Sequence, residues 1–368
     1  MRAFDIEVDL SGVEGLEPGL KSVATVFLPD EVGASAPVIV GYPGSGFTRR
    51  YFHMETKPGY SEAEHHVAQG YVVVACDHVG IGDSTPCDTF ALTIESMAAA
   101  NHATATEIRD RLTAGTLAPG LAPIAVERFA GIGQSMGGCL LIVQQAVHRT
   151  FDGIGLLGWS AVHENMPNPD GGRIVLNEGL PRDMDLRPLA AMQTHASKEV
   201  GQEEELVRYS MHWHEDDPDL VELSMHNLIA DPALAHTMPE WRTAVVPVCC
   251  AQMMAKGVVA PEAAAVDVPV LVACGEIDCV PDPHAEPACY PNAPEVQVAV
   301  FERMAHMHNF ARTRARLWDR IAEFAAALPV AAALPVAAAL PVAADPAMSA
   351  PRSTVPVPGL GGEAGRPC

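Results

Sequence analysis

Short apolar runs, separated by segments long enough for a helix, constrain the fold of this chain more than any other feature. Most runs are continuous stretches of apolar residues, which is typical of parallel strands covered by helices on both faces. Glycine, proline or aspartate bounds the runs, as expected where strands end. The predicted strands are Ser22–Leu28, Pro37–Gly41, Tyr71–Cys76, Arg128–Gly133, Gly153–Gly158, Val268–Cys274 and Val296–Phe301.

Helix signals lie between the apolar runs. Ser61, followed three residues later by Glu64, is a capping pattern that opens a helix toward Gln69, and Gly70 is a natural end for that helix. The stretch 90–113 contains neither glycine nor proline and predicts another helix. Repeated strand–helix–strand units predict an α/β fold with a mostly parallel sheet flanked by helices.

The alternation breaks between residues 160 and 265. Helices are predicted at Glu203–His212 and Leu220–Ile229, and the one predicted strand of this segment is Thr243–Val248. Eight of the fifteen methionines lie here, together with Trp213 and Trp241. Because methionine tolerates irregular packing, we expect part of this segment to line an apolar pocket above the sheet.

The C-terminal segment has a different composition. From Ala325 the unit Ala-Ala-Ala-Leu-Pro-Val occurs three times, and residues rich in proline and glycine follow to Cys368. A proline at every sixth position forbids a continuous helix. The predicted organisation is therefore 1–159 as the first part of the α/β core, 160–265 as a helical cap insertion, 266–326 as the second part of the core and 327–368 as a flexible tail.

Charge and cysteine usage exclude several classes of protein. The formal net charge of −23 repels nucleic acid and anionic membrane surfaces, so neither is an expected partner. The nine cysteines lack metal-site spacing and suit free thiols in a reducing compartment. The first ten residues have no secretory pattern, and no uninterrupted apolar stretch is long enough to span a membrane, so a cytoplasmic location is expected.

The motif Gly-Gln-Ser-Met-Gly at 133–137 indicates a serine nucleophile. It follows the predicted strand Arg128–Gly133 and precedes the helix-like stretch Cys139–Val147. Such a strand-to-helix turn projects a serine hydroxyl from the sheet edge, and flanking glycines permit the tight backbone. Ser135 is therefore the candidate nucleophile.

A serine hydroxyl needs a base, and the base needs an orienting acid, in the chain order Ser, acid, His for such a turn. Asp278 follows a predicted strand and is the preferred acid, with Glu276 and Asp282 as neighbours that could substitute. The turn between the last strand and the last helix offers two histidines. His306 lies closer to the strand end and is preferred as the base over His308.

An oxyanion hole requires two backbone N–H groups. One is expected from Met136, immediately after the nucleophile, where a helix N-terminus also favours negative charge. The second is expected from the glycine-rich loop 42–47, in which either Gly44 or Ser45 could donate and Ser45 is preferred.

Together with the stretch Asp77-His-Val-Gly-Ile-Gly-Asp-Ser84, these motifs resemble the α/β-hydrolase superfamily over residues 20–326. The resemblance implies a mostly parallel α/β-hydrolase sheet with a helical cap and a Ser-His-acid hydrolase that uses no metal and no cofactor. Two features depart from the family pattern. The oxyanion loop has Tyr42-Pro43-Gly44 where many members have His-Gly, and two histidines compete for the role of the base. Because position 135 is serine, the aspartate nucleophile expected of haloalkane dehalogenases and epoxide hydrolases is absent.

The predicted function is hydrolysis of a carboxylic ester, or of a lactone or thioester, of a small to medium apolar substrate. An acyltransferase, a C–C bond hydrolase and a non-catalytic binding protein of the same fold are the alternatives. The clusters His65-His66 and His212–Asp217 carry metal-capable side chains, but neither has a second cluster at metal-site spacing, and no nucleotide-binding motif is present. A homo-oligomer is compatible with the sequence.

Overall fold

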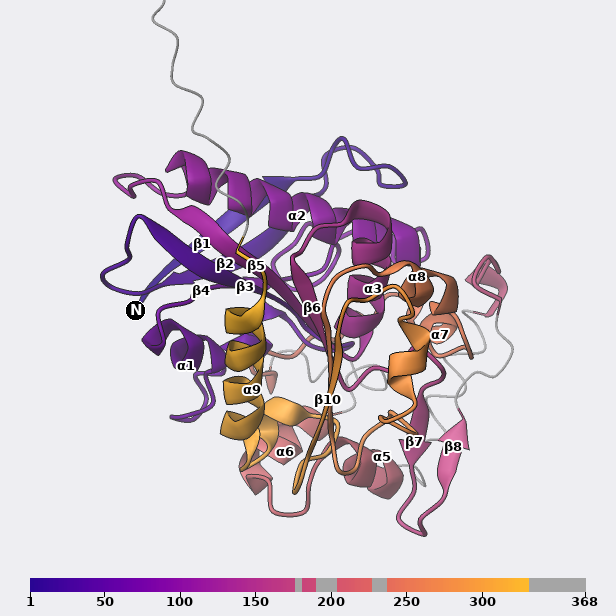
Figure 1. The fold of residues 1–368 in the computed structure, drawn as a ribbon. Coiled ribbons are helices and arrows are strands. Elements are labelled where there is room, and N and C mark those ends of the chain that lie inside the picture. Colours follow the sequence, from indigo (N-terminus) through magenta and orange to yellow (C-terminus); the bar gives the residue numbers. More distant parts are fainter. Residues whose placement is uncertain (176–180, 190–203, 227–236, 331–368) are drawn as a thin grey trace, which may run out of the picture. The chain divides into compact units, whose positions relative to one another are not determined.

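The computed structural model describes residues 1–175, 181–189, 204–226 and 237–330 (Figure 1). Eight strands form one sheet in the order β1-β2-β4-β3-β5-β6-β9-β10. β1 pairs antiparallel with β2 and β2 with β4, and all the other neighbours are parallel. The strands are β1 Arg2–Asp9, β2 Lys21–Leu28, β3 Ser35–Tyr42, β4 Val72–Cys76, β5 Ala125–Gln134, β6 Gly153–Leu157, β9 Val270–Gly275 and β10 Val296–Phe301.

The predicted mostly parallel sheet is confirmed, and each of the seven predicted strands corresponds to an observed one. Sequence reasoning missed β1. This edge strand alternates between exposed and buried residues, so it lacks the continuous apolar run by which the others were identified.

Helices cover both faces of the sheet, which explains why the central strands are apolar throughout (Figure 1). On β3, Val38 and Val40 belong to the core beneath one pair of helices, whereas Ile39 belongs to the core on the opposite face. The first core includes α2 (Ile94–Ala114) and α3 (Met136–His148), and the second includes α1 (Glu62–Ala68) and α9 (Arg314–Ala327). Ser61 caps α1 by accepting a hydrogen bond from the Glu64 amide, as its sequence predicts.

In its described residues, the segment between β6 and β9 contains short helices and one hairpin. Its helices are α5 Glu204–Met211, α6 Pro218–Met225, α7 Cys250–Met253 and α8 Ala260–Ala265, with a 3-10 turn at Arg187–Leu189, and its hairpin joins β7 Asn165–Pro167 to β8 Arg173–Val175. The predicted helices Glu203–His212 and Leu220–Ile229 correspond to α5 and α6, although residue 203 and residues 227–229 lie outside the described part.

One predicted strand of this segment is wrong. Thr243–Val248 is not a strand: Pro247 interrupts it, and the isolated bridge to Phe47 is made by Arg242, the residue before the segment. The hairpin β7–β8 was missed because three-residue strands leave too short a pattern to recognise.

The core also extends past the predicted boundary at residue 326. α9 ends at Ala327, and Leu328 is buried, with its backbone carbonyl accepting a hydrogen bond from Arg128. The predicted flexible tail from 331 onward lies outside the described residues. Across the part of the chain that is described, no helix has the length and apolar character needed to cross a membrane.

Candidate active site

Ser135 lies at the junction of β5 and α3, with a backbone φ of 52° and ψ of −118°. L-residues rarely adopt such angles, so the surrounding packing must hold this turn in place. That packing leaves no space for side chains at two motif glycines. A Cβ at Gly137 would lie 2.3 Å from the Tyr42 carbonyl oxygen, and one at Gly133 would lie 2.4 Å from the Gly137 carbonyl oxygen.

Asp278, just beyond β9, brings the two candidate histidines together. His306 Nδ1 lies 2.6 Å from Asp278 Oδ1, and His308 Nε2 lies 2.8 Å from Asp278 Oδ2. All three side chains are buried. A carboxylate only accepts hydrogen bonds, so each histidine must carry a proton on the nitrogen that faces it. His306 Nε2 and His308 Nδ1 therefore hold lone pairs when the rings are neutral.

The electrostatics of Asp278 favour its ionised form. Burial by itself would raise the pKa of this carboxyl group, but the charges and hydrogen bonds of His306 and His308 outweigh burial and hold the pKa well below its ordinary value. The backbone amides of Gly275 and Cys279 also donate to the two carboxylate oxygens, at 2.8 and 2.7 Å. Asp278 thus remains a charged acceptor that can stabilise an imidazolium.

The neighbouring acids considered from the sequence do not join this cluster. Glu276 is exposed and accepts a hydrogen bond from the Arg303 amide, and Asp282 is exposed and accepts one from the amide of His284. Among the three carboxylates of this loop, Asp278 is the one that contacts the histidines.

The serine turn and the histidine loop meet through Gln134. Its side-chain nitrogen donates to the His306 carbonyl oxygen at 3.1 Å and lies 3.4 Å from His306 Nε2. Within the described residues no hydrogen bond joins Ser135 Oγ to His306 Nε2, so proton transfer between them requires a closer approach than this structure has.

Gly158 is a further residue of the site, and sequence reasoning did not identify it. It follows β6 with a φ of +66°, and a Cβ at this position would lie 3.0 Å from both Asp278 Oδ1 and His306 Nδ1. Glycine therefore lets the backbone pack directly against the acid–base pair. A signal existed in the sequence, because Gly158 ends a predicted strand at the same sheet edge.

The loop expected to supply the second oxyanion donor packs on the serine turn. A Cβ at Gly44 would lie 3.2 Å from Ser135 Cβ and closer still to the Gln134 side chain. The carbonyl oxygen of Pro43, just before this glycine, lies 3.0 Å from His78 Nε2, so a buried histidine anchors the loop. His78 belongs to the Asp77–Ser84 stretch, but the sequence alone predicts no role for it.

Ser45 and Met136, the two predicted oxyanion donors, share a neighbour on α7. The Cys250 sulfur lies 3.0 Å from the Met136 sulfur, and the Ser45 side chain hydrogen-bonds to the same thiol. Burial raises the pKa of Cys250 to about 12, with the Ser45 hydrogen bond acting in the opposite direction. Cys250 is therefore a neutral thiol beside both predicted donors.

The segment between β6 and β9 holds the histidine loop directly. The amides of His306 and Met307 donate to the carbonyl oxygens of Ser210 and Met211 at the end of α5, at 3.2 and 2.8 Å. His212, the next residue, packs edge-on against Phe310 with 4.9 Å between ring centroids. The position of the candidate base thus depends on a helix inserted far away in the sequence.

One group in the described residues has the spacing of a metal site, namely Asp278, Cys279 and His306. Its chemistry does not suit a metal. Four hydrogen-bond donors already occupy the oxygens of Asp278, and burial raises the pKa of the Cys279 thiol well above its ordinary value. The clusters noted in the sequence have other partners, since His212 bonds to Ser224 and His65 to Asp319.

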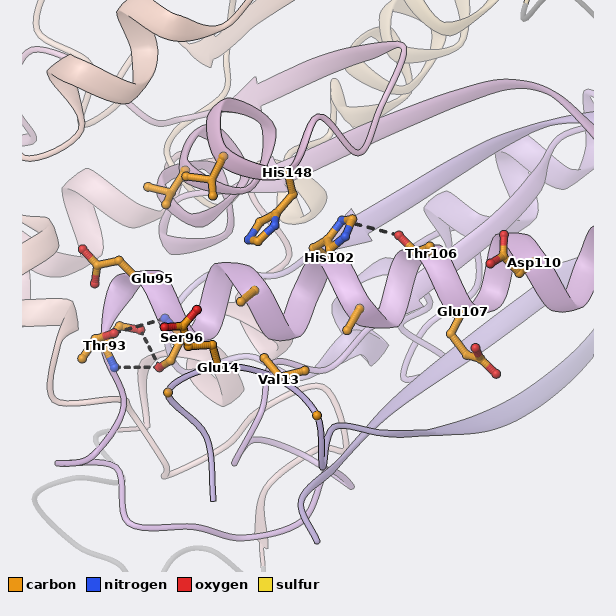
Figure 2. A pocket seen from close by; sticks show the side chains of 16 residues that line it. Val13, Glu14, Thr93, Glu95, Ser96, His102, Thr106, Glu107, Asp110 and His148 are labelled. Carbon is orange, nitrogen blue, oxygen red and sulfur yellow. Dashed lines mark hydrogen bonds between the residues drawn. The ribbon is translucent and has the colours of Figure 1, made fainter. Parts of the chain in front are cut away.

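A separate hollow of about 620 Å³ lies along α2 and α3 and beside the loop 12–15 (Figure 2). None of the predicted site residues lines it. Two of its lining residues, His102 and His148, stack with ring centroids 4.5 Å apart and an interplanar angle of 7°. Burial lowers the pKa of both, and the adjacent ring also lowers that of His102. This hollow lacks the serine turn and the acid–base pair.

Comparisons with known proteins agree with the fold. Residues 16–104 match the model of the Abhydrolase family, and no curated protein sequence matches the chain. Among solved structures, a proline iminopeptidase from Mycobacterium smegmatis is 19% identical with a TM-score of 0.55, covering 88% of this chain and 98% of its own. An esterase from Thermogutta terrifontis is 15% identical with a TM-score of 0.55, covering 87% and 97%. An N-acyl homoserine lactone degrading enzyme is 16% identical with a TM-score of 0.53, covering 87% and 100%.

Proposed function

We propose that the chain is a serine hydrolase of the α/β-hydrolase superfamily, and that it cleaves carboxylic esters with Ser135, His306 and Asp278. The observation that carries this proposal is the buried hydrogen bond between His306 Nδ1 and Asp278 Oδ1, which leaves a lone pair on Nε2 beside the strained Ser135 turn.

In the first step, His306 Nε2 takes the proton of Ser135 as Oγ bonds to the ester carbonyl carbon. The carbonyl oxygen becomes an oxyanion, and we assign its binding to the amides of Met136 and Ser45. In support, the side chains of both residues contact Cys250, so the two segments lie close together. When this intermediate collapses, the bond to the alcohol oxygen breaks. His306 gives its proton to the departing alcohol, and the acyl group remains on Ser135.

In the second step, His306 Nε2 removes a proton from water, whose oxygen attacks the acyl carbon. The bond to Ser135 Oγ then breaks, the serine recovers its proton from His306, and the carboxylic acid leaves. Asp278 stays ionised throughout and stabilises the imidazolium that forms twice in each cycle.

The nitrogen that each ring turns to the carboxylate supports His306 as the base in preference to His308. His306 bonds through Nδ1 and leaves Nε2 beside Gln134, the residue before the nucleophile. His308 bonds through Nε2, and its other nitrogen is buried with no hydrogen-bond partner in the described residues.

The proposed substrate is a small to medium apolar ester, with lactones and thioesters as close relatives of the same chemistry. Two structural neighbours are an esterase and a lactone-degrading enzyme, which supports this substrate class. The surroundings of the serine support it too, because Met136 and the neutral Cys250 thiol lie beside the turn.

The decisive test compares wild type with Ser135→Ala on a panel of p-nitrophenyl esters of short to medium chain length. We expect the variant to lose on the order of 10⁴-fold or more in kcat, because the nucleophile of such a triad is indispensable. A fluorophosphonate should label wild type at Ser135 and leave the variant unlabelled. Equal turnover by both proteins, with no labelling, would rule out the proposal.

A further inference from the structure

Asp278 is shared by two histidines, and the proposed mechanism uses one of them. His308 occupies the carboxylate oxygen opposite to the one that His306 binds. With the amides of Gly275 and Cys279, the two rings bring the number of donors to four. Loss of the His308 donor would leave a buried charge incompletely satisfied, which is costly in a low-dielectric interior.

The position of His308 is rigidly defined. It begins the 3-10 turn His308–Phe310, is 1% exposed, and its ring lies 6.3 Å from that of His306 at an angle of 67°. The next residue, Asn309, is held by hydrogen bonds to Tyr51 and to the buried Glu62. His308 therefore has one available hydrogen-bond partner for Nε2, and that partner is Asp278.

The surroundings make this donor important, because acids predominate among the ionisable groups near the cluster. Glu164 lies close enough to Asp278 for their charges to interact, and the Asp278 charge also reaches Tyr51. Arg173 contacts the Asp278 backbone carbonyl and not the carboxylate. The ionisable groups that interact with Asp278 are His306, His308, Glu164, Tyr51, Cys274, Cys279 and Arg173, and Glu62 and Asp216 lie near Tyr51.

We propose that His308 is a positioning residue that keeps the Asp278 carboxylate ionised and correctly oriented, so that His306 retains its proton on Nδ1 and its lone pair on Nε2. This inference rests on the proposed function, because it assigns His306 as the base. His308 acts through Asp278 and does not touch the substrate.

The test uses His308→Leu, which removes the donor, and His308→Gln, whose amide nitrogen can replace Nε2 as a donor to Asp278. His102→Leu, in the hollow of Figure 2, makes the same exchange away from the cluster. We expect His308→Leu to lower kcat/KM by about tenfold to a hundredfold, the range for losing one hydrogen bond to a charged group. His308→Gln should recover most of the loss, and His102→Leu should match wild type.

The pH dependence separates positioning from a merely structural role. Without the His308 donor, Asp278 is a stronger acceptor and stabilises protonated His306 more. The acid limb of the kcat/KM profile should therefore move to higher pH in His308→Leu and return in His308→Gln. The His306 ring should show the same displacement in an NMR titration with ¹⁵N-labelled histidine, which requires no substrate.

Two results would overturn the inference. One is a His306 titration that is identical in wild type and His308→Leu. The other is an equal loss of activity in the Leu and Gln variants with an unchanged pH profile, which would indicate that His308 only supports the loop. Failure of the proposed function is a different result, namely wild type without Ser135-dependent turnover or labelling, and the NMR titration then decides the role of His308 alone.

Discussion

Two pairs of histidines in this protein each bring their rings close together, but a carboxylate lies between the rings of one pair only. His306 and His308 bind opposite oxygens of one buried carboxylate. His102 and His148 stack face to face beside the hollow of Figure 2, and among the described residues neither bonds to a carboxylate. His102 instead has Thr150 and Thr106 as partners, through hydroxyl groups.

This difference shows which contacts allow an imidazole to act as a base. A carboxylate fixes the tautomer, orients the ring and stabilises the proton that the ring receives. The stacked pair has no such partner, and burial lowers the pKa of both rings, so protonation there is opposed. Proximity of two histidines in a hollow is therefore insufficient evidence for a catalytic site.

The largest expected effect comes from removing the shared carboxylate. Asp278→Asn should lower kcat by about 10⁴-fold, as loss of the orienting acid does in comparable triads. Steady-state kinetics on p-nitrophenyl esters would measure it, with Asp282→Asn as the matched control in the same loop. An Asp278→Asn variant with nearly wild-type kcat would contradict the contrast between the two pairs.

A smaller effect is expected from crowding the acid–base pair. Gly158→Ala places a methyl group 3.0 Å from Asp278 Oδ1 and His306 Nδ1, so we expect activity to fall by about a hundredfold through misplacement of the base. Gly171→Ala is the control, because Gly171 also has a positive φ (+85°) but nothing within 4 Å of the added carbon.

Both glycine variants should lose about 1 kcal/mol of unfolding free energy from the left-handed backbone, measurable by denaturant titration. Activity separates them, since the control should retain wild-type kcat/KM. If the two variants had equal activity, the close packing of Gly158 would have no catalytic importance.

The smallest effect concerns what the stacked pair contributes to the unfolding free energy of the protein in mild acid. Because the pKa values of His102 and His148 are lowered from 6.5 in the folded protein, the unfolded chain binds more protons below about pH 6.5. Their contribution to stability is thus present above that pH and is lost as the pH falls. His148→Gln should show a shallower loss of unfolding free energy between pH 7 and 5 than wild type.

Asp278, the shared carboxylate, affects stability in a lower pH range. The pKa of Asp278 is lowered from 3.8, so its contribution to stability persists down to about pH 4 and is lost below. Urea titrations across the pH range would resolve the two windows. An identical pH dependence for wild type and His148→Gln would show that the stacked pair is not linked to stability.

Local patterns in the sequence predicted most of the central sheet. Strands β4, β6 and β9 are buried at every residue, because both faces of the sheet are covered there, and they carry the continuous apolar runs that identify them. The edge strand β1 and the hairpin β7–β8 were not predicted, since a half-exposed strand and two three-residue strands lack this pattern.

The sequence by itself determined the strand–turn–helix around Ser135 and nominated the acid and two histidines, because each depends on a few consecutive residues. Only the tertiary structure decided which nitrogen of each histidine faces Asp278, that Gly158 packs on the pair, and that α5 holds the His306 loop. These contacts join segments far apart in the chain. Their geometry depends on packing of the whole sheet and its insertion, which no local pattern encodes.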